Sequence, residues 1–201
     1  MEIKILSICI AILVVFSSCN SIPEEITPEP TKFNFPDGWQ SITNHEEKIA
    51  ALQIPQKLLP IMSTEDLAEA CMTYPLGPEC FFFNDYQFGL ARIIENFNGF
   101  AELKKHNDAF DKILDHYSKE LDKIVRKVYD NETLTTEPLQ LFYVEQFIIS
   151  GYLYPVDQLK DSQKLISLYP IAKKLRESSE KFQSHSSINT LNAMKKVLGL
   201  E

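Results

Sequence analysis

The chain is poor in glycine, in arginine and in long apolar runs, and each shortage argues against a class of protein. Only 6 of its 201 residues are glycine, which argues against a β-sandwich or barrel, because tight turns favour glycine. Arginine occurs only at Arg92, Arg126 and Arg176, so bidentate recognition of phosphate or carboxylate is not expected to be the main task of the surface. The longest apolar run, Ile5 to Phe16, has about 12 residues, whereas a membrane-spanning helix needs about 20.

The net charge is negative. The chain has 28 acidic and 20 basic residues and a formal charge of −8 at pH 7. Such a chain has no electrostatic attraction for a polyanion, so we expect no nucleic-acid partner. An anionic membrane face would not attract it either. The hydrophobic content of 44% and the chain that remains after residue 40 predict a single domain with its own core over residues 41–201.

The apolar run near the N-terminus has the length of the central segment of a secretory signal peptide. It is followed by Ser17, Ser18 and then Cys19. This order resembles the bacterial lipobox, although Phe16 stands where that pattern usually has leucine. The resemblance implies that residues 1–18 are a lipoprotein signal peptide, that cleavage occurs before Cys19, and that lipid is attached to Cys19. The alternatives are an ordinary secretory signal with a chance cysteine, or a buried apolar helix.

Residues 19–40 have the composition of a tether. They contain four prolines and several glutamates, which disfavour helix and strand and keep the segment solvated. Trp39, near its end, is expected to be among the first residues that pack onto the domain. Because one acyl chain holds a protein only marginally, we expect several chains on Cys19 to form the membrane contact. The expected location is the bacterial cell envelope, with the outer membrane favoured over the inner one.

Residues 41–201 show helical periodicity nearly throughout, and no segment alternates as a β-strand would. Helices are predicted over residues 44–53, 54–62, 63–74, 84–97, 108–128, 136–151, 157–169, 171–182 and 188–198. Three Tyr-Pro pairs, which begin at Tyr74, Tyr154 and Tyr169, predict breaks between helices, because the residue before proline avoids helical geometry. Their spacing is irregular. The predicted fold is therefore all-α, an irregular stack of helix hairpins that forms a bundle or a short superhelical array.

Three helices carry specific expectations. The helix over residues 84–97 is expected to bury Phe88, Ala91, Ile94 and Phe97 on one face, and Gly99 is expected to end it in a left-handed conformation. The helix over residues 136–151 is apolar on most sides and is expected to be central. The longest helix has a regular apolar stripe, formed by Phe110, Ile113, Leu114, Tyr117, Leu121, Ile124, Val125 and Val128.

The sequence shows no reactive constellation. None of the histidines, which are His45, His106, His116 and His185, has a second ligand at metal-binding spacing, and no glycine-rich phosphate loop or G-x-S-x-G motif occurs. Asp108, Asp111 and Asp115 line one side of the longest helix beside His116. A lysine lies four residues after two of these aspartates, which favours ion pairs on a solvated face over a cation site. We predict no catalytic residue, no metal site and no cofactor.

The most unusual composition is the aromatic segment, FFFNDYQF, from Phe81 to Phe88. We interpret these side chains as part of the core, since helical proteins often pack phenylalanine there. The alternative is an exposed apolar patch that binds a partner or a glycan.

Cys71 and Cys80 are the only cysteines that remain if Cys9 is removed with the signal peptide and Cys19 carries lipid. Two ligands are too few for a structural zinc site. The two residues could form a disulfide around the Pro-Leu-Gly-Pro turn, which would close a loop of about ten residues and contribute roughly 2–3 kcal/mol. They could also stay free and pack as small apolar groups, since Cys71 shares the apolar face of its helix.

Three stretches carry a resemblance: MSTEDLAEACMTYP from Met62 to Pro75, the aromatic segment, and ENFNGFAEL from Glu95 to Leu103. In this order they resemble an uncharacterised family of exported Bacteroidetes proteins, most clearly over residues 49–117. The resemblance implies a helical fold and export. It implies no reaction and no catalytic residue.

These observations favour a lipid-anchored binding or structural module at the bacterial envelope over an enzyme. Its expected partners are the membrane, through lipid on Cys19, and an envelope protein or glycan. The rival interpretation is an envelope hydrolase or carbohydrate-active helical domain. Its acid and base carboxylates would be brought together only by the fold, because such pairs need no proximity in sequence.

Overall fold

The computed structural model describes residues 32–200, and the prediction of an all-α chain is confirmed there: helices occur throughout and no strand does. The α-helices are α1 (His45–Ala51), α2 (Thr64–Met72), α3 (Tyr86–Asn96), α4 (Asn98–Leu103), α5 (Ala109–Tyr129), α6 (Glu137–Ile149), α7 (Gln163–Ser178) and α8 (His185–Val197). The 3-10 helices are η1 (Trp39–Ser41), η2 (Leu59–Ile61), η3 (Gly77–Phe82), η4 (Val156–Asp161) and η5 (Glu180–Phe182). The predicted signal peptide and Cys19 lie outside the described residues.

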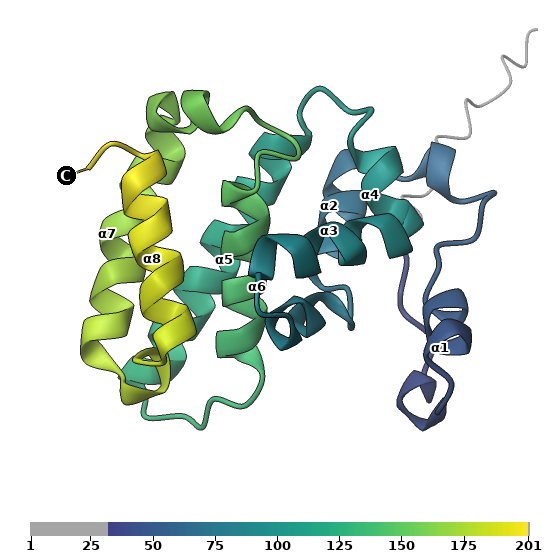
Figure 1. Ribbon diagram of the computed structural model, residues 1–201, viewed down its shortest axis with the longest axis horizontal. Coiled ribbons are helices and arrows are strands. Elements are labelled where there is room, and N and C mark those ends of the chain that lie inside the picture. Colours follow the sequence, from purple (N-terminus) through teal and green to yellow (C-terminus); the bar gives the residue numbers. More distant parts are fainter. Residues whose placement is uncertain (1–31, 201) are drawn as a thin grey trace, which may run out of the picture.

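The helices form an irregular stack around α6 (Figure 1). Ten of the 13 residues of α6 are buried, as expected for a central helix. Helix α2 packs against α5, α5 packs against α6 and α7, and α8 packs against α6 and α7. Helices α7 and α8 therefore form one end of the molecule, and α1 lies at the opposite end (Figure 1). In the chain from residue 32 to residue 200, no helix is both long and apolar enough to span a bilayer.

Side-chain caps start several helices where the sequence predicts a start. Asn44 accepts a hydrogen bond from the Glu47 N–H at α1. At α2, the Ser63 hydroxyl accepts from the Asp66 N–H and donates to the Asp66 carboxylate, so Ser63 caps the start of this helix. Gly199, which follows α8, is left-handed with φ of 64°, as is typical of a glycine at the end of a helix.

Part of the predicted tether contacts the domain. Phe35 packs against Tyr74 and Phe97, which stack on each other, and its ring centroid lies 5.9 Å from each of theirs. Trp39 is half-buried against the core, as expected, and Lys48 lies over its ring at 5.6 Å. The chain is therefore attached to the domain before residue 41.

The predicted apolar face of α3 is wrong at Phe88 and Ala91, whereas Phe97 is buried as predicted and Ile94 packs half-buried against the core. Phe88 is 58% exposed and Ala91 is exposed, whereas Leu90 and Ile93 are buried. The reason is Gly89: a Cβ at this position would lie 2.5 Å from the Cys80 carbonyl oxygen. The absence of a side chain lets the Gly89 side of α3 approach η3, and this contact turns Phe88 outward.

Other predicted boundaries also need correction. Gly99 does not end a helix; it lies inside α4, where a Cβ would meet the Phe97 ring at 2.6 Å. Residues 54–62 form turns and the short η2 instead of a helix. Residues 157–162 belong mostly to η4, so the predicted helix over 157–169 begins later, at Gln163.

The third Tyr-Pro pair does not break a helix. Tyr74-Pro75 and Tyr154-Pro155 separate helices as predicted, but α7 continues through Pro170. Pro170 is exposed. Water can therefore hydrate the carbonyl that loses its helical hydrogen bond, and the proline lowers the stability of the helix without ending it.

Candidate functional site

A buried ion pair lies between the central helix and α7. Glu145 of α6 is 0% exposed and Arg176 of α7 is 4% exposed. Arg176 Nη2 donates to Glu145 Oε2 at 2.5 Å, and the Tyr117 hydroxyl of α5 donates to Glu145 Oε1 at 2.8 Å. Both carboxylate oxygens of Glu145 therefore have a partner.

Each of the three guanidinium nitrogens of Arg176 also has a hydrogen-bond acceptor. Its Nε donates to the Ser187 carbonyl at 3.1 Å and its Nη1 to the Ala172 carbonyl at 3.1 Å. Its carbon lies 5.3 Å from the centre of the Phe142 ring. Burial, first of all, raises the pKa of Tyr117, and the negative charge of Glu145 acts in the same direction. The hydrogen bonds of these groups join α5, α6, α7 and α8. Because the groups are shielded from solvent, they are not placed to meet a substrate.

The rival hydrolase interpretation needs two carboxylates in a pocket. Within the described chain Glu145 is the only acidic residue that is buried, and its partner is a cation. On the surface, the carboxylates of Glu65, Glu69, Asp115 and Glu120 line one pocket beside α2 and α5, but each of them pairs with a lysine. Neither arrangement favours an acid and base pair. Among the same residues, no three His, Cys, Asp or Glu side chains are placed to hold a metal ion.

The aspartates singled out in the sequence do not converge. Asp108 accepts a hydrogen bond from the Thr64 hydroxyl at 2.8 Å, and Asp115 pairs with Lys164 of α7. Burial lowers the pKa of His116, whose Nε2 has no hydrogen-bond partner in the described structure. His45 lies at the exposed start of α1, beside the acidic residues of its first turn.

Cys71 and Cys80 are free and fully buried in the structure. Burial raises the pKa of the Cys71 thiol well above its usual value and that of Cys80 to about 12. Thiols in this state are poor nucleophiles, because the thiolate is the reactive form. The disulfide stays a prediction, and both residues pack as small apolar groups.

The aromatic segment is exposed at three of its phenylalanines, so our interpretation of these side chains as core is wrong there. Phe82 is 85% exposed, Phe83 is 37% exposed, and Phe88 is exposed as described above. The rings of Phe83 and Phe88 meet edge to face, with centroids 5.8 Å apart. Phe82 has no such ring contact among the aromatic pairs of the described residues. Phe83 and Phe88 therefore form an exposed aromatic pair, and Phe82 precedes Phe83 in the chain. We call these three residues the exposed phenylalanine patch.

The backbone under this patch is fixed by buried contacts. Gly77 lies against the Tyr143 ring, where a Cβ would come within 2.6 Å of a ring carbon, and Cys80 is buried. At the start of α3, the Asp85 carboxylate accepts from the backbone N–H groups of Gln87 and Phe88. The exposed rings therefore stand on a rigid support.

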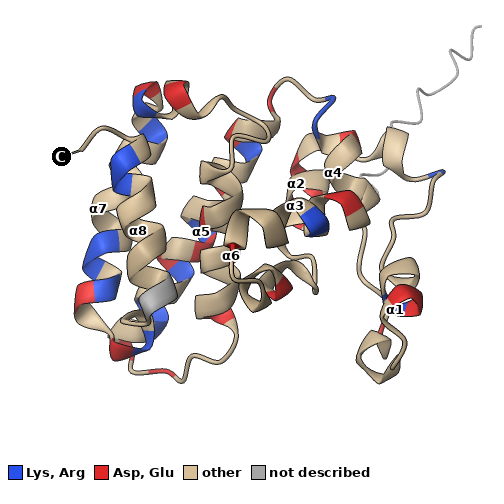
Figure 2. Ribbon diagram, in the orientation of Figure 1, with Lys and Arg blue, Asp and Glu red and all other residues tan. Residues whose placement is uncertain are grey.

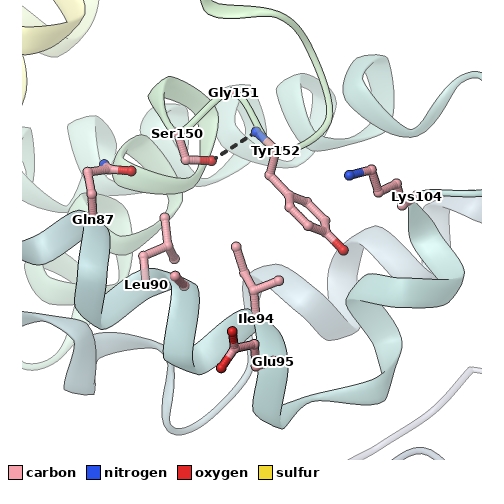
Figure 3. Close-up of a pocket in the computed structure, with 9 residues that line it drawn as sticks. Gln87, Leu90, Ile94, Glu95, Lys104, Ser150, Gly151 and Tyr152 are labelled. Carbon is pink, nitrogen blue, oxygen red and sulfur yellow. Dashed lines mark hydrogen bonds between the residues drawn. The ribbon is translucent and has the colours of Figure 1, made fainter.

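A groove runs along the flank of α3, and we call it the α3 groove. Its volume is about 470 Å³. Its lining residues are Gln87, Leu90, Ala91, Ile94, Glu95, Lys104, Ser150, Gly151 and Tyr152 (Figure 3). The first five belong to α3, Lys104 follows α4, and the last three form the turn that ends α6.

The groove is connected to the core by a chain of amides. Gln87 Nε2 donates to Gln146 Oε1 at 2.7 Å, and Gln146 Nε2 donates to the Thr190 hydroxyl at 2.8 Å. This chain fixes one wall of the groove to α6 and α8. Sequence reasoning missed it, because the three residues are 59 and 44 positions apart.

Comparison of the chain with protein-family models, with curated proteins and with solved structures finds no match.

Proposed function

We propose that this chain is a binding module, displayed by lipid on Cys19 at the bacterial envelope, and that the exposed phenylalanines 82, 83 and 88 bind its partner. The observation that carries the proposal is the exposure of three large apolar side chains on a rigid support. Large apolar side chains that are exposed close together on a protein surface are typical of binding sites.

A partner that covers this patch gains binding free energy from the apolar area removed from water, about 25 cal/mol for each Å². Aromatic side chains are enriched at the centres of protein interfaces for this reason. Phe82 supports this role most directly, because it is the most exposed of the three and can enter a pocket of the partner. The buried contacts of Gly77 and Cys80 keep the loss of entropy on binding small, since the backbone is already ordered.

The partner we propose is a protein with an apolar cleft and a basic rim. Phenylalanine offers no hydrogen-bonding group, whereas a glycan site needs polar groups beside its rings. The acidic residues Glu79 and Asp85 flank the exposed rings, so a basic rim would be attracted to this face. The resemblance to exported Bacteroidetes proteins supports the proposed location.

The test is photo-cross-linking in the native envelope, with p-benzoylphenylalanine in place of Phe82. We expect one discrete protein adduct. The same reagent in place of Tyr129, which is 86% exposed on α5, is the matched control and should give none. Adding Phe83→Ser and Phe88→Ser to the chain that carries the cross-linker at position 82 should abolish the adduct. In the otherwise unmodified chain, the same two substitutions should leave the melting temperature almost unchanged, because exposed side chains contribute little to stability.

Two results would contradict the proposal. One is the absence of any adduct at position 82. The other is an adduct pattern that is the same from positions 82 and 129. Binding of the purified chain to envelope glycans that is lost in Phe82→Ser, without a protein adduct, would instead identify a glycan as the ligand.

A further inference from the structure

The α3 groove differs from the exposed phenylalanine patch in its chemistry, because it combines an apolar floor with the ammonium group of Lys104, for which the described residues provide no ion pair. Its volume of about 470 Å³ lies in the range of small-molecule sites. Leu90 is almost fully buried and Ile94 is half-buried, and together they form the apolar floor (Figure 3).

Lys104 is the cation, and no carboxylate of residues 32–200 forms an ion pair with it. Its neighbour Lys105 has such a pair, with Glu102 at 2.6 Å. The Lys104 ammonium instead lies 4.4 Å from the centre of the Tyr152 ring. A cation–π contact of this kind holds the ammonium in place without neutralising its charge.

The Tyr152 ring has a fixed position. Its backbone N–H donates to the Ser150 hydroxyl at 3.2 Å (Figure 3), and its own hydroxyl donates to the Phe100 carbonyl at 3.4 Å. Ser150 also donates to the Phe147 carbonyl at 2.7 Å. The end of α6 and helix α4 therefore hold the Tyr152 ring, against which the Lys104 ammonium lies.

One carboxylate, that of Glu95, also lines the groove. It pairs with Arg92 on the outer side of α3 at 3.4 Å, and in Figure 3 it points away from Lys104. The unpaired charge of the groove is therefore positive and lies at the Lys104 end. A single lysine without arginine suits a monoanion better than a phosphate dianion, which arginine usually binds with two hydrogen bonds.

We propose that the α3 groove binds an amphipathic monocarboxylate, with its carboxylate at Lys104 and its apolar body over Leu90 and Ile94. This chemistry could come from a free short-chain acid or from the C-terminus of a protein chain that ends in apolar residues. The inference does not depend on the exposed phenylalanine patch, since those three rings do not line the groove.

The test is calorimetric titration of the full chain in lipid nanodiscs, with empty nanodiscs subtracted. The probes are hexanoate, hexylamine, and a peptide that ends in Leu-Leu with a free or an amidated C-terminus. We expect saturable binding of hexanoate, of the free peptide, or of both. Whichever of the two binds identifies the source of the carboxylate. Hexylamine and the amidated peptide should not bind.

Lys104→Gln should weaken the binding about tenfold, which corresponds to about 1.4 kcal/mol. Lys105→Gln is the matched control and should have no effect, because its ammonium pairs with Glu102. Ala91→Trp, at an exposed position that lines the groove, should block binding while the chain stays folded.

The proposal is overturned if neither carboxylate binds to the wild-type chain, if the amidated peptide binds equally well, or if Lys104→Gln binds like the wild type. None of these results alters the expected adduct at position 82, so the two proposals fail separately.

Discussion

At the scale of single residues, the charge of Glu145 is stable inside the protein only because Arg176 and Tyr117 bind it. Removing one partner from such a pair leaves a buried charge without compensation. We expect Arg176→Met to lower the free energy of unfolding by about 3–5 kcal/mol, as measured by urea denaturation.

A double variant provides the control for this prediction. In Glu145→Leu with Arg176→Met no charge is left buried, so it should be more stable than Arg176→Met alone. If the free energy of unfolding of Arg176→Met is within about 1 kcal/mol of the wild type, water reaches Glu145, and the description of a fully buried ion pair is wrong.

Glu137, at the start of α6, makes stability depend on pH. The hydrogen bond from Lys127, first of all, and the N–H of Thr135 lower the pKa of Glu137 to about 2. Because the folded value lies below the ordinary value of 4.5, the stabilisation is complete above pH 4.5 and is lost as the pH falls towards 2.

We expect Glu137→Gln to be about 1–2 kcal/mol less stable than the wild type at pH 7, because a charged acceptor is lost. The difference should shrink between pH 4.5 and pH 2, as followed by urea denaturation at several pH values. Glu132→Gln, on the exposed loop before α6, is the control and should follow the wild type. A difference that is constant over this range would contradict the assignment.

At the scale of elements, the contact between α3 and η3 turns the exposed phenylalanines towards solvent. Gly89→Ala would normally stabilise a helix by about 0.5–1 kcal/mol. Here the new methyl group would meet the Cys80 carbonyl at 2.5 Å, a backbone atom that cannot rotate away. We therefore expect a loss of about 1–3 kcal/mol, the cost of overpacking, in urea denaturation.

The displaced helix should also loosen the aromatic segment, so chymotrypsin should cut after Phe82 or Phe83 faster than in the wild type. Arg92→Ala, on the exposed side of α3, is the control and should change neither the free energy of unfolding nor the rate of chymotrypsin cleavage. A gain in stability in Gly89→Ala would show that α3 does not depend on this close approach.

Several elements could be predicted from the sequence because their signals are local. The stripe of the longest helix and the caps of α1 and α2 depend on residues within a few positions of one another. The face of α3 could not be predicted, because it depends on Gly89 against η3. Helix α7 continues through Pro170 because the proline is exposed to solvent, and the sequence does not show which residues are exposed.

The candidate site was predictable only in part. The composition of the aromatic segment identified the region, but whether its rings lie in the core or in solvent is decided by tertiary contacts. The pair of Glu145 with Arg176 spans 31 positions, and the link from Gln87 to Gln146 spans 59. No periodicity connects residues that far apart, so the fold alone brings them together.

At the scale of the whole molecule, the net charge of −8 is unevenly distributed. Residues 32–152 contain 19 acidic and 11 basic residues, whereas residues 153–200 contain 4 acidic and 8 basic ones. The lysines of α7 and α8 lie at one end of the molecule (Figure 2). The exposed phenylalanines belong to the acidic part, which supports a partner with a basic rim.

The attachment of the chain to a membrane is the prediction that concerns the molecule as a whole. In this prediction the lipid on Cys19 supplies the anchoring energy, because the acidic part of the domain gains nothing from an anionic membrane face. Each buried methylene contributes about 0.8 kcal/mol, so several acyl chains on Cys19 would hold the protein permanently.

We expect cells grown with labelled palmitate to incorporate the label into the wild-type chain, and the label should be absent from Cys19→Ala. Cys9→Ala is the matched control: it leaves the predicted signal peptide apolar and should keep the label, because the thiol at position 9 is removed before lipid attachment is complete. Unlabelled wild-type chain, or a Cys19→Ala chain that is still labelled, would show that Cys19 is not the anchor. In the first case the exposed phenylalanines would have to reach their partner without a lipid anchor on Cys19.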